Sequence, residues 1–251
     1  MRKVVVMFIF AMTAVMASAQ QEKGTWSITP KVGAAVSSIT NNVRANFLIA
    51  KGALPSIGNY LGSSTGTGVE IEGVGTNMKK AKLGLTIGAD VMYQAASKLG
   101  LSAGVFYSTQ GVNFKDCDFS MVKLSNASIN LNCLSVPIMA HYYVAKGLAL
   151  NAGLQLNFFL KKTLTGDLQF KSTTGNSSTE QYTRLDSQDE YCSLDFSIPV
   201  GASYEFNNLV FEVRYNWGIT NIMKSKDFVG GPAPNYKNSS FHLTLGYKFK
   251  L

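Results

Sequence analysis

The sequence predicts an all-β protein, an eight-stranded antiparallel up-and-down β-barrel that spans a membrane. Three observations predict it. Charged residues make up only 15% of the 251 residues, against about 25% in soluble domains. Apolar residues alternate with polar or small residues over eight segments, which is the period of a β-strand. Short connections alternate with long polar ones, as in barrels of the outer membrane, which have short periplasmic turns and long extracellular loops.

The composition excludes two other classes of protein. Hydrophobic residues make up 46% of the chain and aromatic residues 11%, too much for a disordered chain. The only long apolar run lies at the N-terminus, whereas a helical membrane protein needs about 20 apolar residues for each span. The formal net charge is +8.

Residues 1–19 have the features of a secretory signal peptide. A basic start at Arg2 and Lys3 precedes an apolar core, and small residues at 17–19 provide a cleavage site. The apolar run is too short to favour an anchor helix. We therefore expect export, removal of the leader, and a single barrel domain at 20–251.

Alternation is clearest in the segment 209–219. Apolar and aromatic residues occupy its odd positions, and Glu212, Arg214 and Asn216 occupy even ones. One face would contact lipid and the other would line the lumen. The eight expected strands are 26–36, 83–94, 99–108, 129–144, 148–158, 194–204, 209–219 and 241–251, of which 26–36 and 129–144 alternate more weakly.

The connections between these segments indicate which end of the barrel is periplasmic and which is extracellular. Asn207 and Asn208 suit a two-residue hairpin turn, because asparagine tolerates positive φ. Short connections of this kind are expected on the periplasmic side, and an even strand count places both termini there. The four long extracellular loops are expected at 37–82, 111–128, 161–190 and 221–238.

A secreted β-sandwich is the alternative fold, since its strands also alternate. The polar faces here are rich in Gly, Ser, Thr and Asn, which suit a narrow lumen in which larger side chains of eight strands would collide. Pro137 and Pro199 fall in the middle of expected strands. Because proline removes a ladder hydrogen bond, each is expected to mark a bulge or a local bend.

Four charged residues share the inward phase at similar depth. Lys31 and Asp90 come from neighbouring strands, and Glu212 and Arg214 lie two residues apart. A charge in a narrow lumen must be paired, and eight strands leave room only for side chains. We expect these four residues to form a network that plugs the barrel; the alternative is a gated ion path.

The C-terminus and the later strands resemble known families. Thr244, Gly246, Phe249 and Leu251 are similar to the C-terminal assembly signal of outer-membrane barrels, although the final residue is more often Phe. The body resembles the PorT-like outer-membrane β-barrel family. This resemblance implies an eight-stranded barrel in a Gram-negative outer membrane, and it implies no single activity. The stretches that carry it are 134–142, 147–155, 195–204 and 214–222.

Enzymatic function, cofactors and bound metal are not expected. The chain has two histidines, His141 and His242, and no spacing typical of a catalytic triad. Cys117, Cys133 and Cys192 match no metal motif. Whether two of these cysteines form a disulfide is left open.

The function expected is therefore that of an integral, non-enzymatic outer-membrane barrel. It would present extracellular loops or act as a subunit of an envelope or secretion complex; the alternatives are a small or gated channel and a lipid-modifying enzyme. Expected partners are outer-membrane lipid and lipopolysaccharide, the barrel-assembly machinery, and an envelope-complex protein, but not nucleic acid. Lysines near the outer rim would attract lipopolysaccharide phosphate; these are Lys79, Lys80, Lys82, Lys161 and Lys162.

Overall fold

The computed structural model describes residues 22–40, 79–118, 122–170, 178–185, 193–222 and 236–251. The expected signal peptide at 1–19 lies outside the described residues, and so does Cys192. Within these ranges no helix is both long and apolar enough to cross a membrane.

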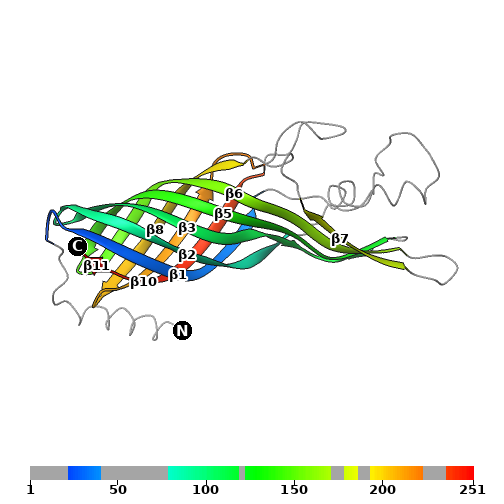
Figure 1. Cartoon of the computed structure of the whole chain (residues 1–251), viewed down its shortest axis with the longest axis horizontal. Helices are drawn as coiled ribbons and strands as arrows, with labels where there is room; N and C mark the ends of the chain where they lie inside the picture. The colour runs from blue at the N-terminus through cyan, green and yellow to red at the C-terminus, as the bar shows by residue number, and fades with distance from the viewer. Residues whose placement is uncertain (1–21, 41–78, 119–121, 171–177, 186–192, 223–235) are drawn as a thin grey trace, which may run out of the picture.

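Eight long strands form a closed antiparallel ring (Figure 1), which confirms the expected fold class. The order around the ring is β5-β3-β2-β1-β10-β9-β8-β6, and pairing of β5 with β6 closes it. Short β11 (Phe249–Lys250) continues the pairing of β10 with β1 in the same register. The long strands are β1 (Trp26–Ile39), β2 (Lys79–Ala96), β3 (Leu99–Phe114), β5 (Val122–Ala145), β6 (Leu148–Phe170), β8 (Leu194–Phe206), β9 (Leu209–Gly218) and β10 (Asn238–Tyr247).

Side-chain burial is inverted relative to a soluble protein. On β9, Glu212 and Arg214 are buried, while Val213 is 42% exposed and Trp217 63% exposed. The same alternation runs around the ring, with large apolar side chains outside and polar ones inside. Because lipid solvates the outer side chains and the closed ladder leaves no edge, this arrangement suits a membrane and not water.

The exposure pattern predicts that a charge introduced on the lipid face of β9 destabilises the barrel more in mid-strand than at the end of the strand. Val213→Arg places a cation on the lipid face in mid-strand and should lower the free energy of unfolding by about 2–4 kcal/mol. Leu209→Arg is the matched control, because it lies on the same face at the periplasmic end of the strand and should lose at most about 1 kcal/mol. Urea titration of the refolded variants in lipid vesicles measures both, and equal losses would show that β9 does not cross lipid in this orientation.

Asparagines form the turn between β8 and β9, as the sequence indicates. Asn207 and Asn208 have φ values of 47° and 69°, the combination required by a two-residue type I′ hairpin turn. The short expected turns fall at one end of the barrel, together with the C-terminus (Figure 1).

The expected bulges at the two mid-strand prolines do not form. Around Pro137, the pairing of β3 with β5 stops at Ala103 and resumes at Phe106 without a change of register. Around Pro199, the pairing of β6 with β8 is interrupted in the same way. Each proline lacks an N–H toward one neighbour, so it opens that ladder locally, but the opposite ladder continues through it.

Several strands continue beyond the membrane into segments expected to be loops. β3 reaches Phe114, β5 begins at Val122 and β6 ends at Phe170 (Figure 1). Two additional strands, β4 (Cys117–Asp118) and β7 (Ser178–Leu185), pair with these extensions. The expected loops at 111–128 and 161–190 are therefore partly strand, because backbone pairing continues after the lipid-facing pattern stops.

The apolar face of β5 changes sides where the strand leaves the lipid. Within the membrane, outward residues such as Ile138 are apolar and inward Ser135 and His141 are polar. Farther out, inward Leu131 and Cys133 are apolar and fully buried. Above the membrane water replaces lipid, so the apolar side chains turn inward. The weak alternation of 129–144 results from these two opposite phases in one segment.

The inward apolar residues of this outer part form a layer that we call the apolar cap. Val112 of β3 is paired with Ile129 of β5, and Cys133 is paired with Phe159 of β6. Ser37 of β1 hydrogen-bonds the backbone N–H and C=O of Gly111, which joins β1 directly to β3 past the intervening β2, where the pairing of β2 with β3 is interrupted. The cap comprises Ile39, Val112, Phe114, Ile129, Leu131, Cys133 and Phe159, all buried.

Candidate functional site

The lumen of the membrane-spanning part holds the four charged residues singled out in the sequence. Lys31 lies on β1, Asp90 on the neighbouring β2, and Glu212 and Arg214 on β9, which β10 separates from β1. The register pairs Thr244 of β10 with Glu212 and Gly246 with Lys31. The ring therefore places all four inward-facing side chains in one space, and all are buried.

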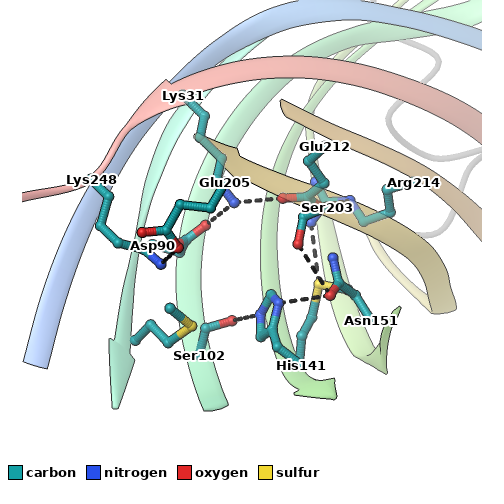
Figure 2. A network of polar contacts seen from close by, with 12 residues as sticks. Lys31, Asp90, Ser102, His141, Asn151, Ser203, Glu205, Glu212, Arg214 and Lys248 are labelled. Carbon is teal, nitrogen blue, oxygen red and sulfur yellow. Dashed lines mark hydrogen bonds and ion pairs between the residues drawn. The ribbon is translucent and has the colours of Figure 1, made fainter. Parts of the chain in front are cut away.

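Lys31 is the centre of this network (Figure 2). Its ammonium lies 2.5 Å from Oδ2 of Asp90 and 2.5 Å from Oε2 of Glu212. Gly246 lies against the Lys31 side chain, and a Cβ at that position would lie 2.6 Å from Lys31 Cγ. Glycine at 246 therefore makes room for the lysine stem.

Arg214 extends the network toward the centre of the lumen. Its Nε lies 3.6 Å from Oε1 of Glu212, a looser contact than those of Lys31. Its guanidinium group lies 5.1 Å from the ring centroid of Phe106, within the range of a cation–π interaction. A Cβ at Gly88 or Gly104 would come within 2.8 Å of the Phe106 ring. These two glycines leave space for the Phe106 ring beside the guanidinium.

A second ion pair lies nearby and was not anticipated as part of the network. The ammonium of Lys248 donates a hydrogen bond to the carboxylate of Glu205, and both side chains are largely buried (Figure 2). The inward phase of Lys248 is visible in the sequence, but its partner on β8 depends on how the ring closes. With this pair, three cations face three carboxylates in the same part of the lumen: Lys31, Lys248 and Arg214 with Asp90, Glu205 and Glu212.

His141 is held at both ring nitrogens. Nε2 lies 2.7 Å from Ser102 Oγ, and Nδ1 lies 2.9 Å from Asn151 Oδ1 (Figure 2). The connectivity is that of a Ser–His–Asn triad, which the sequence did not reveal because the three residues come from three strands. Hydrolysis also needs free N–H donors for an oxyanion, whereas Ser102 lies in continuous strand pairing and all three side chains are buried. The arrangement is that of a buried histidine with satisfied hydrogen bonds.

Asp195 forms a further polar cluster nearer the outer end of β8. Its carboxylate accepts hydrogen bonds from Thr220 Oγ1 at 2.6 Å and from Asn157 Nδ2 at 3.1 Å. Asn157 also donates to Ser197 and accepts from Ser135. The lumen is thus filled with hydrogen-bonded side chains above the charged network as well as within it.

The lysines at the outer rim do not form one phosphate-binding group. Lys79 donates to the backbone carbonyl of Ile39, Lys82 donates to Asn130, and Lys162 is buried. Lys80 and Lys161 are exposed. Lys162 is therefore turned into the protein, and Lys79 and Lys82 are half-buried with a contact to the protein, whereas Lys80 and Lys161 point outward.

The residues of the expected C-terminal assembly signal divide between the two faces of the last strand. Thr244 is buried in the lumen and Gly246 packs against Lys31. Phe249 and Leu251 are exposed on the lipid face. The backbone N–H of Leu251 donates to the carbonyl of Trp26, so the end of the chain is paired with the start of β1.

The described residues contain no cluster of three or more histidine, cysteine or acidic side chains suited to a metal ion. Cys133 is a buried free thiol in the apolar cap. The side chain of Cys117 and all of Cys192 lie outside what the structure describes.

A closed ring with an apolar exterior and a polar, charge-paired interior defines an integral β-barrel of the membrane. A family model described as "Outer membrane protein beta-barrel domain" matches residues 18–224, and the chain belongs to this family. The protein is accordingly located in the outer membrane of a Gram-negative bacterium.

The solved structures that are similar to this chain include three outer-membrane or surface proteins. The attachment invasion locus protein Ail of Yersinia pestis is 14% identical, with a TM-score of 0.39 and coverage of 91% of this chain and 100% of its own. OprG from Pseudomonas aeruginosa is 17% identical, with a TM-score of 0.39 and coverage of 92% and 99%. Neisserial surface protein A is 10% identical, with a TM-score of 0.39 and coverage of 89% and 97%. No curated protein matches the chain.

Proposed function

We propose that this protein is a sealed, non-enzymatic outer-membrane barrel whose role lies in its extracellular part, as a loop-presenting surface or as a subunit of an envelope or secretion complex. The observation that carries the proposal is that buried side chains occupy the lumen in two layers. A charge-balanced network lies within the membrane, and the apolar cap lies farther out, on the inner face of β1, β3, β5 and β6.

The two layers oppose ion flow by different physical means. In the charged layer Lys31 and Lys248 are in close contact with carboxylates, so a passing ion would have to displace one of these partners. In the cap an ion would meet buried apolar side chains, which cannot replace its hydration. A constitutive channel needs a wider lumen than eight strands leave.

The finer family assignment and the partners are part of the same proposal. The stretches at 134–142 and 214–222 support a PorT-like protein, and residues 1–19 would direct export as a signal peptide. The barrel-assembly machinery would recognise the C-terminal signal ending at Leu251. Lipopolysaccharide would contact the outer rim through the exposed Lys80 and Lys161.

Conductance in a planar lipid bilayer tests the seal. The refolded full chain should give no discrete conductance steps, because both layers of the lumen are packed. A heat-induced shift of mobility on an SDS gel should confirm that the same preparation is folded, since a closed ladder opens only as a whole. Regular conductance steps from folded wild-type protein would favour the channel alternative.

A further inference from the structure

Outside the membrane, β5 and β6 leave the ring and continue as a ribbon with two additional strands. β6 is paired with β8 only as far as Phe158. From Thr163 to Phe170 its second neighbour is β7, and β4 takes the corresponding place beside β5. We call β4, the outer parts of β5 and β6, and β7 the outer ribbon (Figure 1).

Unlike the closed ring, the outer ribbon has sheet edges. All eight residues of β7 pair with β6, and among the described strands none pairs with the opposite edge of β7. A strand at a sheet edge presents backbone N–H and C=O groups that can pair with another strand. β7 is therefore a candidate surface for strand addition.

The sequence of β7 is complementary to itself in one orientation. If two copies pair antiparallel about Tyr182, residue 180, a glutamate, stands opposite residue 184 of the other copy, an arginine. The pairing occurs twice by symmetry, with the two Tyr182 residues opposite each other. Directly opposed charges of opposite sign and aromatic pairs stabilise an antiparallel sheet, whereas like charges destabilise it. In a parallel alignment in register, Glu180 would face Glu180 and Arg184 would face Arg184.

The direction of β7 then determines how the two barrels lie. β6 leaves the periplasmic turn and runs outward, and β7 is antiparallel to it, so β7 runs back toward its own membrane. Two β7 strands that pair antiparallel run in opposite directions. Their membranes must therefore lie at opposite ends of the paired ribbons, and the two barrels face each other.

We propose that β7 pairs antiparallel with β7 of a second copy embedded in a facing outer membrane, so that the protein joins two bacterial or vesicle surfaces. This proposal rests on the proposed role of the extracellular part as an interaction surface. Among the side chains that the structure describes, Leu160 is the last exposed apolar one of β6, and Gly166, six residues farther out, is paired with Tyr182. At about 3.3 Å per residue the centre of β7 lies at most ~20 Å above Leu160, which sets an upper limit of about 40 Å for the gap between paired membranes.

Vesicle clustering tests the pairing. The full chain is refolded into phosphatidylcholine vesicles that carry donor or acceptor dyes, and clustering is followed by light scattering and energy transfer. Wild-type vesicles should cluster, with a membrane gap of at most about 40 Å in electron cryomicroscopy. Glu180→Lys alone and Arg184→Glu alone should each reduce clustering about tenfold, because each opposes like charges at two positions in a contact that many copies repeat.

Charge exchange distinguishes pairing from a general loss of structure. Mixing Glu180→Lys vesicles with Arg184→Glu vesicles restores both opposite-charge pairs, and clustering should return between the two populations. The double variant should cluster with itself for the same reason. Lys146→Glu, a charge reversal in an exposed periplasmic turn, should cluster as the wild type does. Every variant should keep the heat-induced mobility shift of a folded barrel.

Wild-type vesicles that stay dispersed at high protein density would overturn the proposal, as would a mixture of the two single variants that fails to cluster. Clustering of either single variant at the wild-type level would also overturn it. Conductance of the same vesicles separates the two proposals: dispersed vesicles with a sealed lumen refute only the pairing of β7, whereas ion leakage from folded wild-type protein refutes the proposed sealed barrel.

Discussion

Lys31→Met should lower the free energy of unfolding by about 3–5 kcal/mol, the range found when one partner of a buried ion pair is removed. Lys31 is the contact shared by Asp90 and Glu212, each at 2.5 Å. Without it Asp90 and Glu212 are two buried carboxylates that lack their shared cation. Only Glu212 then keeps a cationic neighbour, the Arg214 guanidinium at 3.6 Å. Arg214→Ala should cost less, because Glu212 then keeps its shorter contact with Lys31.

The measurement is equilibrium unfolding in urea, with the folded fraction read from the mobility shift on unheated gels. Glu212→Gln added to Lys31→Met restores equal numbers of positive and negative charges in the network and should recover part of the loss. Lys146→Met, in an exposed turn, is the matched control and should change stability little. If Lys31→Met and Glu212→Gln lose stability additively, the network does not act as a unit.

Leu131→Ala should destabilise the apolar cap by about 2–5 kcal/mol, the range for a large-to-small substitution in a packed core. Leu131 is 1% exposed and belongs to the part of β5 whose apolar face has turned inward. Its replacement leaves a cavity between strands that water surrounds and lipid cannot fill. The loss should therefore resemble that of a soluble protein, although the residue belongs to a membrane barrel.

Leu154→Ala is the matched control for this prediction. Leu154 is 67% exposed on the lipid face of β6, so lipid chains can occupy the space of the missing side chain and no cavity remains. Urea titration should show a clearly smaller loss for Leu154→Ala than for Leu131→Ala. Equal losses would mean that the cap is not a packed layer distinct from the lipid-facing surface.

The amino-acid sequence by itself determined which residues cross the membrane and which face they occupy. A strand has a period of two, so burial and exposure on β9 follow from alternation alone. The Asn207–Asn208 turn likewise follows from local chemistry, because asparagine tolerates the positive φ of both positions. These features depend on neighbours along the chain, and a single segment contains the information for them.

The sequence predicted which residues belong to the candidate site, but not which of them contact one another. The inward phase placed Lys31, Asp90, Glu212 and Arg214 in the lumen, but the choice of Lys31 as the shared partner depends on the stagger between β1, β10 and β9. The Lys248–Glu205 pair and the hydrogen bonds of His141 also join strands that are distant in sequence. Ring closure alone decides which inward side chains meet.

The apolar cap and the outer ribbon were decided only by the tertiary structure. At Cys133 the apolar face of β5 changes from the inner to the outer side of the barrel. Because the sequence shows both patterns in one segment, the segment looks like a single strand with weak alternation. The backbone pairing of β6 with β7 extends into a polar segment that carries no lipid-facing pattern. The physical reason is the change of solvent: within the bilayer the sequence pattern reports contact with lipid, whereas beyond it the position of each apolar side chain depends on which other strands are there to bury it.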